Sequence, residues 1–391
     1  MSFHLSSFVD LVTKYNSWDA LKAFLTSVEG GSLRVLDASP KYSIVRYVKG
    51  KSDFTKVWVR EARSVVWDVE SNRPVCFAPI KAEKGYPPKD LSGAFLSDFV
   101  DGTMINAFRP STGSPVITTR TSLNATNTFY DFYSTPQQSF AEMFTSSLTS
   151  FGSMEQFLNS ILEPNQFASF VLQHPSNRIV APVSQPRIFV VALGSIKEDG
   201  SALVNTNTST FPSTLLPFAP CSYTHPVDFK ALCKKGSYWQ GVVFQDSASS
   251  RRWRLRNPSY TVLRTLRGPE ACGFERFLRL RREGSMKEYL KCYSDESKLM
   301  WAYETLFRTT TQDLYDAYVE KNKLKKKGMK DLDLPLRTHV YALHGKYLAS
   351  VQAGTAVPVT KESVIQYVNM LSLDDQKKLV GTKYSGMLVS S

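Results

Sequence analysis

The sequence contains no long hydrophobic run. Its longest apolar stretch, Ile188–Leu193, is far shorter than the roughly 20 residues that a helix needs to cross a bilayer. The N-terminal stretch MSFHLSSFVDLVTKYNSWDALKAFL carries charged side chains throughout, which excludes a secretory signal and favours an amphipathic helix. We therefore expect a soluble protein with no membrane partner.

Cysteine is also scarce. The five cysteines are an odd number, lie far apart and form no Cys-x-x-Cys pair: Cys76, Cys221, Cys233, Cys272 and Cys292. This usage argues against a disulfide framework and favours a reducing, cytoplasmic compartment. The spacing of Cys221, His225 and Cys233 matches no common zinc pattern, so buried thiols are the better reading and no metal site is expected.

Carboxylates are missing from one strongly basic stretch. Residues 247–269 include six arginines and no acidic side chain. In a strand, Arg252, Arg254 and Arg256 would project from one face, and the residues between them from the other. Such a row of guanidinium groups can grip phosphate oxygens, whereas without an anion the charges repel one another. The alternative reading is a solvated strand face.

The whole chain is basic as well. Its net charge is +13 over 391 residues, which favours a polyanionic partner, nucleic acid before an anionic membrane. An indifferent basic surface is the alternative. Two further basic clusters, Arg276–Arg282 and Lys321–Gly328, are candidates for contacts to a nucleic-acid backbone or, equally, for solvated faces.

The residue patterns change near Gly268. From about Tyr42 to Leu266, short strand-like runs alternate with turn-forming residues, interrupted by a helical stretch at Gln138–Leu162 and a polar surface excursion at 201–226. The strand-like runs are YSIVRYV, TKVWVREARSVVWDV, PVITTRT, RIVAPV, PRIFVVAL, YWQGVVFQD and RRWRLR. After Gly268, apolar residues recur at three- and four-residue spacing, which predicts helices. The predicted fold class is α+β, with a β-rich domain at residues 1–267 and an α-helical domain at residues 268–391.

Several short motifs follow one another along the β-rich part. They are Arg63-Ser64 before an apolar strand, the turn Asp101-Gly102-Thr103, Arg120 in VITTRTSL, HPSNRIVAPV, Gly241-Val242-Val243, Arg254-x-Arg256 and Tyr260. In this order and spacing they resemble the phage-type (class 1) RNA ligase family, which seals cut tRNA. The resemblance covers roughly Tyr42 to Tyr260. It implies a nucleotidyltransferase-like antiparallel β domain with flanking helices, followed by an α-helical C-terminal domain.

The sequence departs from the family pattern at the positions that would carry the chemistry. The resemblance implies a lysine, two residues before Asp101-Gly102, that attacks ATP and forms a lysyl-AMP, but this position is Phe99. The resemblance also implies two carboxylates for metal ions and ribose, and their positions hold Val171 and Gln240. The cationic positions keep their charge as arginine, which binds phosphate but stays protonated and cannot attack.

We therefore expect a catalytically inactive RNA-ligase-like protein that binds RNA or a phosphorylated end, with no catalytic residue, no metal and no required cofactor. The residues expected to bind nucleotide or RNA phosphate are Arg63, Asp101, Gly102, Arg120, Gln240, Gly241, Arg254, Arg256 and Tyr260. Phe99 would fill part of the vacated nucleotide pocket. The structural alternatives are a simple tight turn at Asp101-Gly102, an ion pair of Arg63 with Asp68 or Asp98, and packing of Tyr260.

Two other functions stay open. The first is an active RNA ligase that requires ATP and magnesium and uses a displaced lysine, namely Lys81, Lys84 or Lys89. The second is a structural or assembly component of a large virus particle or a ribonucleoprotein. By analogy with the family, a viral protein of this kind would act in the host cytoplasm or in the virion.

Overall fold

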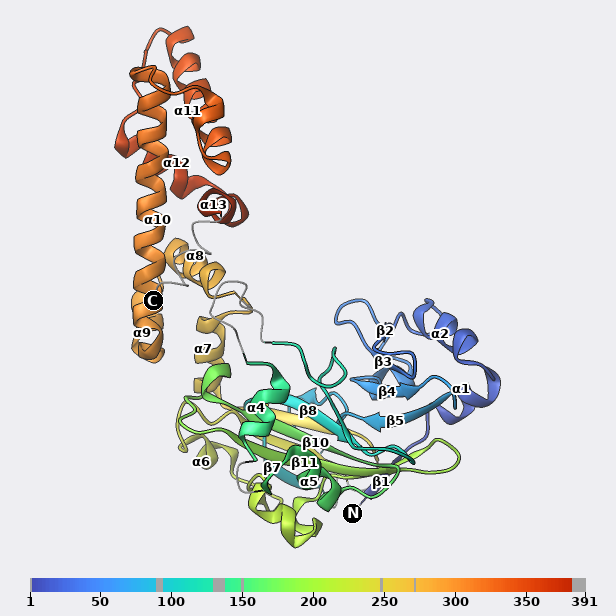
Figure 1. The fold of residues 1–391 in the computed structure, drawn as a ribbon. Coiled ribbons are helices and arrows are strands. Elements are labelled where there is room, and N and C mark those ends of the chain that lie inside the picture. The colour runs from blue at the N-terminus through green and yellow to red at the C-terminus, as the bar shows by residue number, and fades with distance from the viewer. Residues whose placement is uncertain are drawn as a thin grey trace. The chain divides into compact units, whose positions relative to one another are not determined.

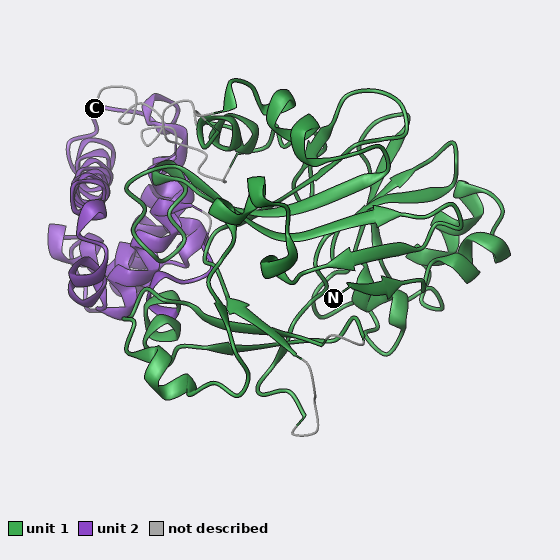
Figure 2. Cartoon of the chain, turned by 90° about the horizontal axis from the view of Figure 1, so that it is seen from below, with its two compact units in different colours: residues 1–129, 138–264 green, residues 130–137, 265–391 purple. Residues whose placement is uncertain are grey.

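A computed structural model describes residues 2–88, 94–128, 138–148, 151–246, 249–270 and 272–381. The chain forms two compact units, coloured separately in Figure 2: residues 1–129 with 138–264, and residues 130–137 with 265–391. The described strands all lie in the first, β-rich unit, and the second unit is helical (Figure 1). The predicted α+β class with antiparallel sheets is confirmed.

The largest sheet of the β-rich unit has six antiparallel strands in the order β1-β12-β11-β10-β8-β9. Their bounds are Ser2–Leu5 (β1), Ala202–Asn205 (β12), Arg187–Ile196 (β11), Gln166–Gln173 (β10), Thr103–Phe108 (β8) and Val116–Thr118 (β9). The helices α4 (Phe140–Ser146) and α5 (Met154–Ile161) pack on this sheet (Figure 1). Phe170 of β10 anchors this packing, because its ring contacts an aromatic ring from each helix.

The helical stretch predicted at Gln138–Leu162 thus contains two helices. Each begins at a capping box, in which a serine hydroxyl accepts a hydrogen bond from the backbone N–H three residues later, and the backbone N–H of the serine donates to the side chain of that later residue: Ser139 with Glu142, and Ser153 with Gln156.

A second, four-stranded sheet is an antiparallel meander in the order β2-β3-β4-β5. Its strands are Arg34–Asp37 (β2), Tyr42–Arg46 (β3), Val65–Asp68 (β4) and Arg73–Phe77 (β5). The helices α1 (Val9–Lys14) and α2 (Trp18–Thr26) contribute apolar residues to the same core. The N-terminus, predicted as an amphipathic helix, is therefore a strand followed by two helices.

The third sheet has five strands in the order β13-β7-β14-β15-β6. They are Ser222–Tyr223 (β13), Phe95–Asp98 (β7), Gly241–Gln245 (β14), Arg252–Arg256 (β15) and Glu83–Lys84 (β6). Only the β15–β6 pair is parallel. One face packs on residues from and around α6 (Phe229–Cys233). On β15 the residues between the arginines are buried, as the two-residue period predicts.

Two strand predictions are wrong. The run TKVWVREARSVVWDV begins with a short helix, α3 (Val57–Glu61), which buries Val59, and only its second half forms β4. The run RIVAPV forms no strand and follows a 3-10 turn at Pro175–Asn177. The polar excursion at 201–226 includes β12, β13, 3-10 turns at Thr208–Thr210 and Ser213–Phe218, and the buried side chains of Phe211 and Leu215.

The helical unit has a core of its own. Its helices are α8 (Gly273–Glu283), α9 (Met286–Cys292), α10 (Ser297–Tyr318), α11 (Leu334–Gln352), α12 (Lys361–Met370) and α13 (Leu373–Val380) (Figure 1). The helix α7 (Pro258–Arg267) begins in the β-rich unit and ends in the helical one. Within the described ranges, no helix is both long enough and apolar enough to span a membrane.

Candidate functional site

The segment 99–102 connects two different sheets. β7 ends at Asp98 in the five-stranded sheet, whereas β8 begins at Thr103 in the six-stranded sheet. The turn expected at Asp101-Gly102 therefore lies in a crossover between two sheets and not in a hairpin. Because the crossover leaves one sheet and enters the other, it brings residues of both sheets to one place.

The start of this crossover is held from two sides. The backbone N–H of Phe99 donates to the carbonyl of Gly241 on β14 at 2.8 Å. One oxygen of the preceding Asp98 carboxylate accepts hydrogen bonds from the indole Nε1 of Trp239, at 2.7 Å, and from the Tyr223 hydroxyl. These contacts fix the backbone from which the Phe99 side chain projects.

Asp101 serves the fold. Its carboxylate is buried and accepts three hydrogen bonds: from the backbone N–H groups of Val180 and Ala181, both at 3.0 Å, and from the Tyr260 hydroxyl at 2.7 Å. Burial and this carboxylate raise the pKa of Tyr260. Asp101 therefore ties the crossover to the segment after HPSNR and to α7, and its oxygens are already engaged within the protein.

The two glycines permit close approach of strands. A Cβ atom on Gly102 would lie 2.4 Å from the carbonyl oxygen of Leu172 on β10. A Cβ atom on Gly241, whose φ is +136°, would lie 2.0 Å from the carbonyl oxygen of Leu255 on β15. Both separations are far below van der Waals contact, so the packing of backbones explains these glycines without a ligand.

The positions implied to bind metal and ribose are buried and lack carboxylates. Val171 lies on β10, between β8 and β11. Its side chain packs against Gly102, because a Cβ atom added to Gly102 would lie 2.7 Å from a Val171 methyl group. Gln240 is 5% exposed, and its backbone carbonyl accepts the N–H of Asn257 at 3.0 Å. With Phe99 at the nucleophile position as well, the residues present do not fit the ATP and magnesium site that the resemblance implies.

Five arginines lie together beside the crossover, and we call them the arginine cluster: Arg63, Arg120, Arg252, Arg254 and Arg256. Three of them donate to backbone carbonyls of one segment: Arg63 to Pro79 at 3.2 Å, Arg252 to Ile80 at 3.4 Å and Arg254 to Ala82 at 3.0 Å. Arg120 donates to the carbonyls of Tyr47 at 2.8 Å and of Arg63 at 3.3 Å. Carbonyl oxygens thus orient four of the five arginines, and these oxygens carry no full negative charge to balance the guanidinium groups.

The charges of this cluster act on one another. Burial is the first cause that lowers the pKa values of Arg63, Arg252, Arg254 and Arg256, and neighbouring arginines lower them further. Arg264, an exposed residue of α7, adds to the repulsion on Arg254 and Arg256. The guanidinium groups remain charged at neutral pH, so these shifts reflect first the cost of burying the charges and then the cost of holding them close together.

Carboxylates near the cluster form ion pairs with residues outside it. Among the described residues, no member of the cluster has a carboxylate within salt-bridge distance, whereas the adjacent Arg251 pairs with Glu83 at 3.6 Å. The expected alternative in which Arg63 pairs with Asp68 or Asp98 is wrong, because Asp68 pairs with Lys41 and Asp98 with Lys235. The buried Nε–H groups of Arg252 and Arg256 also have no acceptor in the described part of the chain.

The ring of Phe99 lies beside two of these charges. The guanidinium carbons of Arg256 and Arg254 lie over the ring, 5.3 Å and 6.0 Å from its centroid. These separations are in the range of cation–π contacts. Phe99 is half-buried, so the ring borders the cluster and is not enclosed in an apolar core.

Lys81, one of the lysines considered as displaced nucleophiles, lies close enough to the cluster to be affected by its charges. Its Nζ is 3.8 Å from the ring centroid of Phe54 and 5.5 Å from that of Tyr47. Burial lowers its pKa, and the charges of Arg254, Lys49 and Arg120 lower it further. Lys84 is exposed, and its backbone lies opposite that of Arg254 in the register of β6 and β15. Lys89 lies outside the described residues.

Cys76, Cys221 and Cys233 are free thiols. The expected burial of Cys221 and Cys233 is wrong, because Cys221 is exposed and Cys233 is only half-buried, whereas Cys76 and Cys272 are buried. Within the described ranges, no group of three or more His, Cys, Asp or Glu side chains is placed to hold a metal ion.

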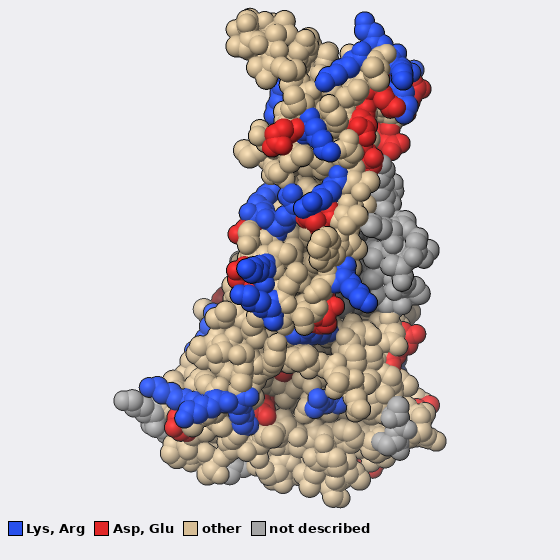
Figure 3. Space-filling model, turned by 90° about the vertical axis from the view of Figure 1, so that its left-hand side faces the viewer, with Lys and Arg blue, Asp and Glu red and all other residues tan. Residues whose placement is uncertain are grey.

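The two basic clusters of the helical unit differ. Arginines at Arg276–Arg282 pair with carboxylates of the same unit: Arg276 with Glu296 at 3.0 Å, Arg279 with Glu270 at 2.6 Å and Arg281 with Glu304 at 3.2 Å. Blue and red side chains accordingly lie beside one another in the upper part of Figure 3. The lysines after α10 are mostly exposed, with Lys327 paired to Glu320 at 2.8 Å.

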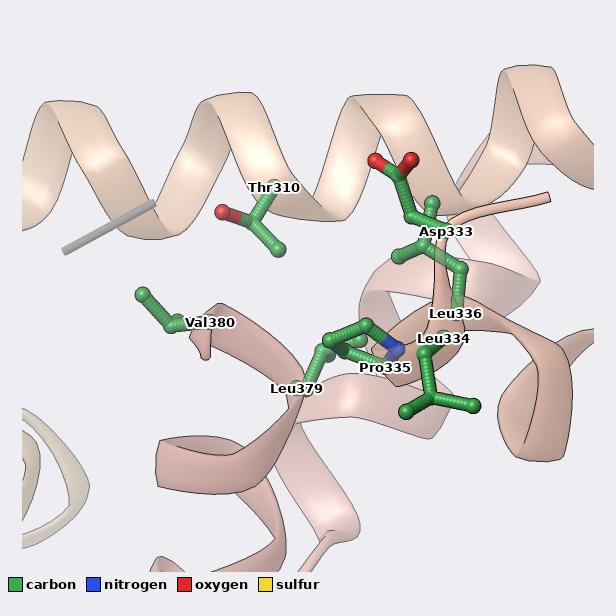
Figure 4. Close-up of a pocket in the computed structure, with 7 residues that line it drawn as sticks. All are labelled: Thr310, Asp333, Leu334, Pro335, Leu336, Leu379 and Val380. Atoms are coloured by element: carbon green, nitrogen blue, oxygen red, sulfur yellow. The ribbon is translucent and has the colours of Figure 1, made fainter. Parts of the chain in front are cut away.

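The helical unit also contains a cavity of about 280 Å³, shown in Figure 4. Its lining is mostly apolar and comes from α10, from the start of α11 and from the end of α13: Thr310, Asp333, Leu334, Pro335, Leu336, Leu379 and Val380. The Thr310 hydroxyl donates to the carbonyl of Leu306 in its own helix at 2.9 Å, so the cavity offers few free polar groups.

Sequence patterns missed the residues that surround the arginine cluster. Tyr47 lies under Arg120, with 4.6 Å between the guanidinium carbon and the ring centroid, and also near Lys81. Arg46, on β3, has its pKa lowered by burial and by Arg120. The run YSIVRYV predicted a strand there, but nothing in it pointed to partners more than 70 residues away.

No protein-family model matches the chain, and no curated protein matches it. Among solved structures, the chain is similar to an archaeal ATP-dependent RNA ligase, with 13% identity and a TM-score of 0.36 over 75% of this chain and 77% of that one. It is also similar to a putative ATP-dependent DNA ligase from Aquifex aeolicus, with 15% identity and a TM-score of 0.34 over 78% of this chain and 81% of that one. These TM-scores are too low to assign a fold family or an activity.

Proposed function

We propose that the protein is an RNA-ligase-like platform that binds RNA or a phosphorylated end through the arginine cluster and does not form a lysyl-AMP. The observation that supports this most is the convergence of five arginines that, in the described part of the chain, have no carboxylate partner. A phosphate would relieve their repulsion and accept charge-assisted hydrogen bonds. The proposed domains are 1–267 and 268–391, divided where α7 ends.

The members of the cluster would contribute in different ways. Arg254 and Arg256 are half-buried, so they can reach a ligand, and Arg264 is exposed beside them. Arg63 is occupied with a backbone carbonyl and adds mainly its positive field. Asp101, Gly102, Gly241 and Tyr260 would support the site through the fold.

The side chains present support the proposed inactivity. Phe99 has no nucleophilic atom, and Val171 and Gln240 offer no carboxylate for a metal ion. A protein altered in this way keeps an attraction for phosphate but lacks the groups for adenylyl transfer. We therefore propose no required cofactor.

RNA binding can be measured by fluorescence anisotropy with a labelled, 5′-phosphorylated single-stranded RNA over a range of salt concentrations. The double variant Arg254→Gln/Arg256→Gln should bind about 10- to 100-fold more weakly. Its slope of log K against log salt should fall by about 1.4, because each phosphate contact to a single strand contributes roughly 0.7. Arg187→Gln, the same type of substitution made once at an exposed residue of β11, is the control for removing an arginine outside the cluster.

Equal affinities of the double variant and Arg187→Gln would contradict a role for the cluster. No binding of the wild-type protein to RNA, together with a salt-insensitive protein partner, would favour the structural or assembly function.

One observation favours a second candidate, an active ligase that uses Lys81. An attacking lysine must be neutral, and the pKa of Lys81 is lowered beside the cluster. Incubation with α-labelled ATP and magnesium or manganese, followed by a denaturing gel, tests this. A band that is stable to base and labile to acid, lost in Lys81→Arg and retained in Lys84→Arg, would establish it. No labelled band is expected if the first proposal is right.

A further inference from the structure

Phe99 differs from an aromatic residue that merely fills space. A filler would be enclosed by apolar side chains, whereas this ring is half-buried and lies 5.3 Å and 6.0 Å from the guanidinium carbons of Arg256 and Arg254. The ring and the two cations therefore form one composite surface.

The backbone that carries the ring and one of the two guanidinium groups are held in place by hydrogen bonds within the protein. The Phe99 N–H is hydrogen-bonded to Gly241 at 2.8 Å, and the neighbouring Asp98 carboxylate to Trp239 at 2.7 Å. Arg254 is held by the carbonyl of Ala82 at 3.0 Å. Fixed aromatic rings and guanidinium groups bind with little loss of conformational entropy.

A flat aromatic ring next to two guanidinium groups matches the chemistry of a nucleotide. The ring can stack on a nucleobase, and the guanidinium groups can hold the adjoining phosphate. Bases inside a duplex are already stacked on both faces, so only an unpaired base can use such a ring.

Resting on the proposed function, we propose that this surface binds an unpaired nucleotide of single-stranded RNA, with the base against Phe99 and a flanking phosphate on Arg254 and Arg256. The site would thus recognise a single-stranded segment or an unpaired end, and not phosphate alone.

The test compares two labelled single-stranded RNA oligomers of equal length and charge, one with natural bases and one abasic throughout. The wild-type protein should bind the natural oligomer about tenfold more tightly, the factor that stacking of one base on an aromatic ring supplies. Phe99→Leu should abolish this preference and leave the affinity for the abasic oligomer unchanged. Phe99→Trp should keep the preference, and Phe95→Leu, the same substitution at the start of β7, is the matched control.

The outcomes separate the two proposals. Equal wild-type affinities for both oligomers, or a Phe99→Leu variant that keeps the preference, would overturn the stacking site while RNA binding through the arginines stands. Failure of the wild-type protein to bind either oligomer would overturn the proposed function itself. The double variant Arg254→Gln/Arg256→Gln should lower the affinity for both oligomers by the same factor, because the substitutions remove contacts to phosphate only.

Discussion

The replacement Glu61→Gln should stabilise the protein at neutral and alkaline pH. Glu61 is 4% exposed at the end of α3, and its carboxyl group accepts a hydrogen bond from the Ser7 hydroxyl at 2.5 Å. Burial raises its pKa from the ordinary value of 4.5 to about 7, although the contacts to Ser7 act in the opposite direction. Its backbone carbonyl accepts the backbone N–H of Arg63 at 2.8 Å.

The magnitude follows from the two pKa values. The folded-state pKa of about 7 exceeds the unfolded value of 4.5, so between these pH values the folded protein holds a proton that the unfolded chain releases. The contribution of Glu61 to the free energy of unfolding is therefore complete below pH 4.5 and is lost as the pH rises through 7. One pKa unit corresponds to about 1.4 kcal/mol, so the full loss is about 3 kcal/mol. A glutamine at this position cannot ionise, so the variant should not lose this stability at high pH.

The assay is urea unfolding of wild-type and Glu61→Gln protein, followed by tryptophan fluorescence, from pH 4.5 to pH 8.5. The variant should match the wild type at the acidic end and exceed it by up to about 3 kcal/mol at the alkaline end. Glu29→Gln, at an exposed position, controls for the change in net charge. A constant difference across this pH range, or a variant less stable at pH 8, would refute the reasoning.

Three further predictions concern the site and the helical unit. Phe99→Lys should not restore labelling by ATP, which the denaturing gel measures. It should also lower the free energy of unfolding, measured with urea, by about 1–3 kcal/mol, because it adds a third cation beside two guanidinium groups. Tyr260→Phe leaves an oxygen of the buried Asp101 carboxylate without its donor, so it should cost about 1–3 kcal/mol while RNA affinity changes little; a large loss of affinity would show that Tyr260 contacts the ligand. Arg276→Gln breaks a buried pair with Glu296 and should cost about 3–5 kcal/mol, with faster hydrogen exchange confined to the helical unit; exchange that is unchanged there would contradict this account.

The arginine strand shows what local pattern can predict. The alternation of RRWRLR predicts a strand with its arginines on one face, and in β15 the intervening Trp253 and Leu255 are buried. Side chains of a strand alternate whatever its partners are, so this inference needs no knowledge of the rest of the chain. The change from strand-like to helical spacing near Gly268 is predictable for the same reason.

Other elements depend on partners that are remote in sequence. The motif HPSNRIV was expected to lead into a strand, but the N–H groups of Val180 and Ala181 donate to the Asp101 carboxylate and not to a neighbouring strand. The valines of α3 favour a strand by propensity, yet the helix places Val59 in the core. Tertiary contacts outweighed local preference in both cases.

The sequence by itself determined the chemistry available to this protein: a basic chain, an arginine-lined strand, and a phenylalanine, a valine and a glutamine where the resemblance implies a lysine and two carboxylates. Only the tertiary structure decided which of these groups meet. The crossover from β7 to β8 passes between two sheets, so Phe99 lies beside arginines of a strand some 150 residues later, and Arg120 reaches the carbonyl of Tyr47, 73 residues earlier. Arginines that are far apart in the sequence come together because backbone carbonyls orient their side chains and the core fixes the strands that carry them. Neither the carbonyl contacts nor the packing of the strands can be predicted from a local sequence pattern.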